Sequence, residues 1–182
     1  MGVGGEPRIS ISTVQYSIFN LQVNNRNQDK RNLLIYGYGN PGRQDDGVGV
    51  ALVEELEAWA KAEGLTGLAM DTNYQLNAED ALAVAESREV VFVDAAREGR
   101  EPFEFKRLEP CGEIAFSTHA MSPESVLALA AELYGKTPPA WMLAIRGYGW
   151  EVHAPPTAAA QQNRAAARDH LRLWLQARPR GA

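Results

Sequence analysis

The segment that decides the fold spans residues 33–49 and reads LLIYGYGNPGRQDDGVG. Its first four residues are apolar and run into a glycine-rich stretch, which is typical of a buried parallel strand that ends in a loop. After the loop, apolar residues recur at helical spacing from Val48 to Trp59, and this pattern stops at Gly64. A strand, a glycine-rich loop and a helix in this order predict the first unit of a parallel sheet.

The same alternation of strands and helices continues toward the C-terminus. Val90 to Val93 forms the clearest buried strand, which stops at Asp94, and Ser122-Pro123 is typical of a helix start. We predict further strands over 68–76, 103–108 and 141–145, and further helices over 78–87, 123–135 and 156–177. This pattern predicts an α/β sandwich with a largely parallel sheet over residues 33–178. Residues 1–32 are expected to form an N-terminal extension that is either flexible or a hairpin.

The composition is that of a globular protein that does not bind nucleic acid. The chain has 182 residues and a net charge of −5, and it lacks a basic stripe of the kind that contacts phosphates. Its apolar runs are far shorter than the ~20 residues of a membrane span, and its start does not have the pattern of a secretory signal. We therefore expect a cytoplasmic protein without a membrane partner. Because no coiled-coil pattern is visible, we expect a monomer.

The loop at 37–42 allows other interpretations, which the residues after it disfavour. GYGNPG fits the G-x-G-x-x-G pattern of a dinucleotide-binding loop, but Asp45 and Asp46 place two negative charges where a phosphate would bind. The loop is also similar to the opening of the peptidyl-tRNA hydrolases, but the histidine of their motif is missing. A structural interpretation remains for both acids, in which Asp45 caps the next helix and Asp46 adds a favourable charge to its first turn.

Two aspartates and one histidine come from loops that we expect at one edge of the sheet. Asp46 follows the first strand, Asp94 follows the most apolar strand, and His119 lies just before a helix start. Sites in parallel sheets gather where the strands end. Two carboxylates and one imidazole suit a first-row divalent ion with open coordination positions. The alternative is that all three are hydrogen-bonded loop residues.

Five segments together resemble the [NiFe]-hydrogenase maturation endopeptidases. The resemblance runs in order from Leu33 to Leu175 and leaves out residues 1–32. Ala78 stands where the family usually has proline. Thr72-Asn73, which follow Asp71, stand where the family more commonly has glycine-rich residues. The five segments are 37–49 (GYGNPGRQDDGVG), 74–81 (YQLNAEDA), 91–95 (VFVDA), 117–123 (STHAMSP) and 145–151 (IRGYGWE).

The resemblance implies a fold, an activity and a partner. The fold is a three-layer sandwich with a twisted sheet, of the phosphorylase/hydrolase-like kind. The activity is that of an aspartic-type endopeptidase that cuts one bond near the C-terminus of a hydrogenase large-subunit precursor. The nickel is expected to arrive with this substrate, and no organic cofactor is expected. A competing interpretation is a non-catalytic chaperone that binds nickel or the large subunit.

The resemblance also assigns roles to residues. It implies that Asp46, Asp94 and His119 are the catalytic and metal-contacting residues. The expected substrate-binding residues are Gly39, Asn40, Asp45, Asp71 and Gln75.

Overall fold

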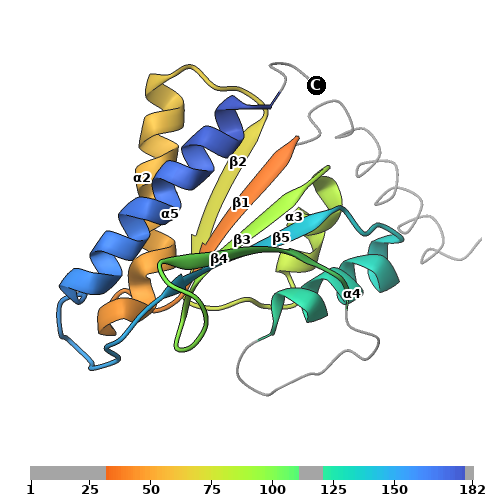
Figure 1. Cartoon of the computed structure of the whole chain (residues 1–182). Coiled ribbons are helices and arrows are strands. Elements are labelled where there is room, and N and C mark those ends of the chain that lie inside the picture. Colours follow the sequence, from red (N-terminus) through yellow and green to blue (C-terminus); the bar gives the residue numbers. More distant parts are fainter. Residues whose placement is uncertain (1–31, 111–120, 179–182) are drawn as a thin grey trace, which may run out of the picture. The chain divides into compact units, whose positions relative to one another are not determined.

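A sheet of five strands forms the centre of the structure (Figure 1). The computed structural model describes residues 32–110 and 121–178. The chain divides into two units after Lys30, and the sheet belongs to the second unit. The sheet order is β2-β1-β3-β5-β4, in which β4 runs antiparallel to β5 and the other neighbouring pairs are parallel. The strands are β1 (Leu33–Tyr38), β2 (Leu68–Asn73), β3 (Val90–Ala96), β4 (Phe103–Leu108) and β5 (Ala140–Arg146).

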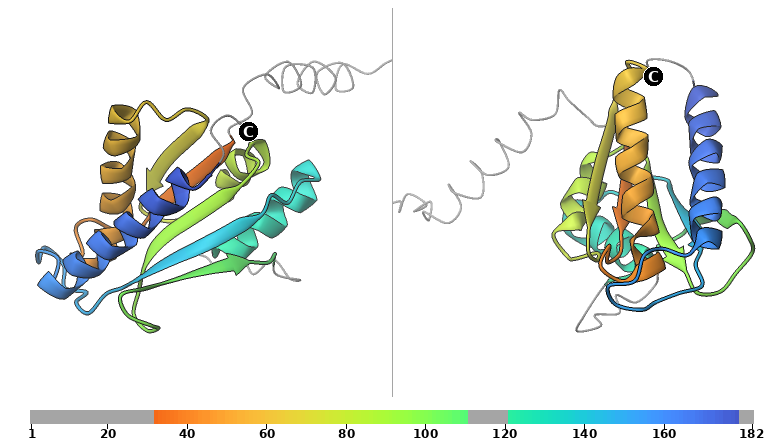
Figure 2. Two further views of the ribbon diagram at one scale, coloured as in Figure 1. Left: turned by 45° about the horizontal axis from the view of Figure 1, so that its top comes forward. Right: turned by 90° about the vertical axis from the view of Figure 1, so that its left-hand side faces the viewer.

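Helices cover both faces of this sheet (Figures 1 and 2). On one face lie α2 (Val48–Ala62) and α5 (Ala158–Gln176), and on the other lie α3 (Asp80–Glu86) and α4 (Pro123–Tyr134). A short 3-10 helix, η1 (Gln44–Gly47), leads into α2. The predicted α/β sandwich of three layers with a largely parallel sheet is therefore confirmed. None of the described helices is long and apolar enough to span a bilayer.

Each face of the sheet has its own apolar core, because successive residues of a strand point to opposite faces. On β1, Leu33 and Ile35 pack under α2 and α5, whereas Leu34 and Tyr36 pack under α3 and α4. The first four residues of β3, 90–93, are fully buried on both faces. Burial on both faces explains why these strands read as continuous apolar runs in the sequence.

The strand order reverses between β1 and β3. The chain leaves β1 through α2 to reach β2, and it returns through α3 to reach β3 on the other side of β1. Since these two connections run in opposite directions, a constant handedness places α2 and α3 on opposite faces. The loops after β1 and β3 therefore diverge at this point, which is where ligands bind in open α/β sheets.

Two predicted boundaries around β2 and α3 were too generous. The strand ends at Asn73 rather than Leu76, because the chain bends and the Asn73 side chain accepts the N–H of Tyr74 at 2.8 Å. The helix begins at Asp80 rather than at residue 78. Oδ2 of the Asp80 carboxylate accepts the N–H of Asn77 at 2.7 Å and so closes the turn before the helix.

Side-chain caps define the starts of α4 and α5. At α4 the prediction is confirmed, because Ser122 is the N-cap, its hydroxyl accepts the N–H of Ser125 at 3.1 Å, and Pro123 is the first helical residue. The start of α5 was predicted at residue 156, but the helix begins two residues later. Thr157 is its N-cap and accepts the N–H of Ala160 at 3.2 Å.

Candidate functional site

Asp46 and Asp94 lie close together at the edge of the sheet where the parallel strands end. Asp46 is in η1, directly before α2, and Asp94 lies near the end of β3. A Cβ atom at Gly39 would lie 2.0 Å from the carbonyl oxygen of Asp46 and 3.4 Å from Oδ1 of Asp94. The negative charge of Asp46 also acts on the pKa of Asp94. The structure thus brings two of the three predicted metal-contacting side chains together.

Two glycines make this approach possible. Gly39 follows β1 with a φ of +127°, and its missing side chain leaves room for the backbone of Asp46. Gly49 lies in the first turn of α2, where a Cβ atom would come within 2.6 Å of the Val93 oxygen and 2.9 Å of the Tyr38 oxygen. A larger residue at either position would push the start of α2 away from the ends of β1 and β3.

The loop after β1 is held by its own polar groups. The N–H of Asn40 donates to Oδ2 of the half-buried Asp46 at 3.2 Å, and Oδ1 of Asn40 accepts the N–H of Gly42 at 2.8 Å. A phosphate would need these backbone donors. Because they are bonded to carboxylate and amide oxygens, the structure gives the dinucleotide interpretation no support.

Asp94 has a carboxyl group whose pKa lies far above its usual value. Burial is the largest influence and raises the pKa, whereas the N–H of Ala95, which donates to Oδ1 at 2.7 Å, lowers it. The charge of Asp46 raises it again, and a hydrogen bond from Tyr38 lowers it. The net effect raises the pKa of Asp94 from 3.8 to about 7, so this carboxyl can gain or lose a proton near neutral pH.

Tyr38 belongs to the site although its chemistry was missed in the sequence. It ends β1 on the face that α4 covers, and its ring packs against the core there. Burial and the charges of Asp94 and Glu124 raise the pKa of its hydroxyl, which therefore stays protonated. The hydroxyl donates to Sδ of Met142 at 4.0 Å and lies within reach of Asp94. The alternation along β1 places Tyr38 on the same face as Leu34 and Tyr36, and it was the one signal that pointed to this residue.

Asp45 has a different role from the ones expected. The sequence suggested a substrate-binding residue or a helix cap, but Asp45 is fully buried, and no side-chain cap starts α2. Its carboxylate accepts the N–H groups of Tyr148 and Gly149 and both donors of Thr157. Burial alone would raise the pKa of Asp45, but these hydrogen bonds outweigh it and the pKa is lowered. The chain itself therefore supplies the hydrogen-bond donors of this carboxylate, and burial keeps it from contacting a substrate.

Asp71 and Gln75 lie near the end of β2 and are both exposed. Oδ1 of Asp71 accepts the N–H of Thr72 at 2.8 Å, and Nε2 of Gln75 donates to Oδ1 of Asn77 at 3.2 Å. Among the described residues, no hydrogen bond or ion pair joins either side chain to Asp46 or Asp94. Together with Tyr74, which is 67 % exposed, they form an exposed stretch in β2 and the loop after it. We call this stretch the rim.

His119 lies in the segment 111–120, outside the described residues. Within 32–110 and 121–178, no three His, Cys, Asp or Glu side chains are grouped as a metal site. The neighbouring carboxylates of Asp46 and Asp94 nevertheless offer oxygen ligands of the kind that divalent ions bind. The charge of Asp46 raises the pKa of Asp94, and a bound cation would offset that repulsion. The described part of the site thus fits a divalent ion but leaves its coordination incomplete.

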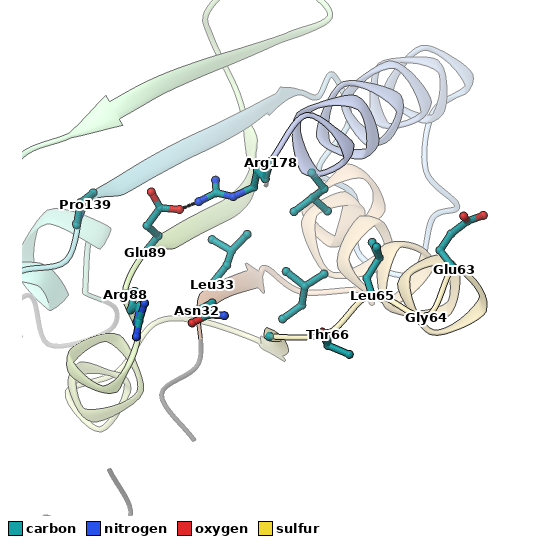
Figure 3. A pocket seen from close by; sticks show the side chains of 13 residues that line it. Asn32, Leu33, Glu63, Gly64, Leu65, Thr66, Arg88, Glu89, Pro139 and Arg178 are labelled. Atoms are coloured by element: carbon teal, nitrogen blue, oxygen red, sulfur yellow. Dashed lines mark ion pairs between the residues drawn. The ribbon is translucent and has the colours of Figure 1, made fainter. Parts of the chain in front are cut away.

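A cavity of about 470 Å³ lies at the opposite edge of the sheet (Figure 3). It is lined by Leu33 and Leu68, the first residues of β1 and β2, by Leu175 near the end of α5, and by Glu89 and Arg178, which form an ion pair. Because Asp46 and Asp94 lie where the strands end rather than where they begin, this cavity is separate from the carboxylate site.

Comparison with known proteins identifies the fold. No protein-family model matches the sequence, and no curated protein matches it. Three similar solved structures carry related names. The [NiFe] hydrogenase maturation protease HycI from Thermococcus kodakarensis is 22% identical with a TM-score of 0.63, covering 85% of this chain and 99% of its own.

Two Escherichia coli proteins show the same likeness. The hydrogenase maturating endopeptidase HybD is 20% identical with a TM-score of 0.60, over 79% of this chain and 91% of its own. The endopeptidase HycI is 21% identical with a TM-score of 0.56, over 79% of this chain and 90% of its own. The arrangement of strands, helices and loops that places Asp46 beside Asp94 is thus the fold of the hydrogenase maturation proteases.

Proposed function

We propose that this protein is an endopeptidase that removes the C-terminal peptide from a [NiFe]-hydrogenase large-subunit precursor. The observation that supports it most is the pairing of Asp46 with Asp94 at the switch point of a fold shared with hydrogenase maturation proteases. Neither the fold nor the carboxylate pair would suffice alone. Similar folds serve different activities, and paired carboxylates occur in many sites.

The substrate we propose is a precursor that already carries nickel. Asp46 and Asp94 would contact this nickel as temporary ligands, and His119 would be the third. Oxygen and imidazole ligands suit a first-row divalent ion. Two carboxylates alone bind such an ion weakly. The free protein would therefore bind the ion weakly but measurably, and its affinity would become high when a nickel-loaded precursor supplies the remaining ligands. Nickel would then serve as the signal that the precursor is ready for cleavage.

The side chains around Asp94 would control the proton traffic of the reaction. A divalent ion, when bound, lowers the pKa of a water molecule and polarises a carbonyl group. Asp94, with a pKa of about 7, can accept a proton at neutral pH. Tyr38 keeps its own proton and would turn it toward Asp94, which would help to orient the carboxyl group.

The exposed rim would bind the peptide on either side of the scissile bond. Gly39 and Asn40 would shape the floor of the site, while Asp71 and Gln75 present exposed polar side chains. We propose these four as substrate-binding residues and exclude Asp45, since its side chain is buried.

The alternative is a chaperone that binds nickel or the large subunit without cutting it. The same fold and the same carboxylates would serve that purpose, so only the covalent state of the precursor separates the two functions. A chaperone leaves the precursor at its full mass, whereas a protease shortens it by one peptide.

Asp46→Asn is expected to lower cleavage of nickel-loaded precursor at least ~100-fold. Loss of a residue that only holds a metal ligand in place already costs up to ~100-fold, and Asp46 is proposed as a ligand itself. The reason is that asparagine removes the charge that faces the ion while it keeps the size of the side chain. The rate is measured by following the mass of the large subunit with time. Asp169→Asn is the matched control, because Asp169 is exposed on α5, and full activity is expected there. Equal rates for Asp46→Asn and wild type would remove Asp46 from the site.

A further inference from the structure

A buried carboxylate stands next to the site without taking part in the proposed chemistry. Asp45 is 0% exposed and directly precedes Asp46. A buried charge is costly unless hydrogen bonds compensate for it. Asp45 is compensated by four donors, which are the N–H groups of Tyr148 (2.8 Å), Gly149 (2.9 Å) and Thr157 (2.6 Å), and the hydroxyl of Thr157 (2.8 Å).

These donors come from both ends of one segment, residues 147–157, which joins β5 to α5. Tyr148 and Gly149 lie just after the end of β5, and Thr157 is the N-cap of α5. The Thr157 hydroxyl donates to Asp45 while it accepts the N–H of Ala160 at 3.2 Å. One carboxylate therefore fixes both the exit from the sheet and the start of the last helix.

Further bonds join the same two segments. The N–H of Asp45 donates to the oxygen of Gly149 at 3.1 Å, and the N–H of Glu151 donates to Oε1 of Gln44 at 3.1 Å. Nε of Arg43 donates to the oxygen of Trp150 at 3.1 Å. Gln44 has a φ of 47°, a conformation that non-glycine residues avoid and that surrounding bonds must hold. We call this set of bonds between residues 43–45 and 147–157 the clasp.

The clasp restrains the backbone that leads into Asp46. The Asp45 side chain and its N–H are both bound to the 147–157 segment, and the N–H of Asp46 donates to the oxygen of Arg43 at 3.0 Å. Asp46 then meets the N–H of Asn40 on one side and faces Asp94 on the other. A shift of about 1 Å at such a position is enough to disable a site.

We propose that Asp45 is a positioning residue, which acts through the clasp to hold Asp46 against Asp94 for metal contact. This inference rests on the proposed function and adds a residue to it. It also assigns the 147–157 segment a part in the site, although that segment supplies none of the proposed ligands.

The test compares Asp45→Asn with wild type in two measurements. Asparagine has nearly the same shape, but its NH₂ group would face N–H donors, so part of the clasp opens. We expect kcat for nickel-loaded precursor to fall at least ~10-fold, and the affinity of the free protein for Ni²⁺ in a calorimetric titration to fall ~10-fold or more. Both are measured at a temperature where circular dichroism shows a folded variant.

Control variants separate positioning from loss of stability. Leu171→Ala opens a cavity in the core under α5 and destabilises the fold without touching the clasp, so its kcat and its Ni²⁺ affinity should equal those of wild type when it is folded. Thr157→Val removes the hydroxyl that donates to Asp45 and should impair both readouts in the same direction. Thr157→Ser keeps a hydroxyl, so its kcat and its Ni²⁺ affinity should be close to those of wild type. These Thr157 variants also decide the matter if Asp45→Asn does not fold.

Each result has a defined meaning. If folded Asp45→Asn or Thr157→Val matches wild type in kcat and in Ni²⁺ affinity, the positioning role is wrong and the proposed function stands. If wild type does not cleave the precursor but binds Ni²⁺ more tightly than Asp45→Asn does, the protease assignment fails and the positioning role is supported. Wild-type protein that neither cleaves nor binds Ni²⁺ overturns both.

Discussion

Asp94→Asn is expected to abolish cleavage and yet to stabilise the folded protein at pH 8. Cleavage should fall at least ~100-fold, because the variant lacks a charged ligand and a proton acceptor. The free energy of unfolding should rise by about 1–3 kcal/mol, because asparagine removes a partly buried charge that Asp46 repels. Asp94 would thus weaken the fold while it serves the site, which is the usual trade-off between stability and activity.

The pH dependence gives this prediction its sign. Asp94 has a pKa of about 7 in the folded protein and near 3.8 in the unfolded chain, so between these values the folded state holds a proton that the unfolded state has lost. The free energy of unfolding therefore falls as the pH rises through this window and levels off above it. Asparagine does not titrate, so the stabilisation should be present at pH 8 and nearly absent below pH 4.

Urea unfolding of metal-free protein at pH 4 and pH 8 measures the effect. Asp169→Asn serves as the control, because Asp169 is exposed and forms only surface ion pairs, so its replacement should change the stability by less than about 1 kcal/mol at either pH. An Asp94→Asn variant whose stability relative to wild type does not change with pH would mean that folding does not raise the pKa of the Asp94 carboxyl.

Gly39→Ala is expected to cost about 3 kcal/mol or more of stability and to disable the site. The added Cβ atom would lie 2.0 Å from the backbone oxygen of Asp46, and the φ of +127° is one that alanine rarely adopts. Relief requires the start of α2 to move, and Asp46 moves with it. Thermal unfolding and the cleavage assay measure the two consequences.

Gly64→Ala is the matched control for this prediction. Gly64 also has a positive φ, of +65°, but a Cβ atom there meets nothing within 4 Å. The expected cost is only about 1 kcal/mol from the backbone conformation, and activity should be intact. If both variants lose the same stability and Gly39→Ala keeps full activity, the close contact between the loop after β1 and the start of α2 does not hold Asp46 in place.

Local sequence patterns predicted most of the fold. The apolar runs of β1 and β3 could be recognised because both faces of these strands are buried, and the Ser122-Pro123 cap marked α4 because its hydrogen bond spans only three residues. The place of Asp94 followed from the same logic, since it directly ends the most apolar part of β3. Features of this kind depend on neighbours in the chain and are visible in it.

The role of Asp45 depends on partners more than 100 residues away and was not predictable in this way. A carboxylate before a helix has the same local pattern whether it caps that helix or binds a distant segment, and only the fold shows that its donors are Tyr148, Gly149 and Thr157. Tyr38 presented the same difficulty, because an aromatic residue at the end of a strand reads as core. His119 stays a prediction from the sequence, since it lies outside the described residues.

The most direct measurement is intact-mass spectrometry of a hydrogenase large-subunit precursor, in nickel-loaded and nickel-free form, after incubation with this protein. We expect the loss of one C-terminal peptide from the nickel-loaded form alone, because Asp46 and Asp94 need the ion to engage the substrate. Binding without any loss of mass from either form would contradict the protease and favour the chaperone. Loss from both forms would keep the protease and remove nickel as its signal.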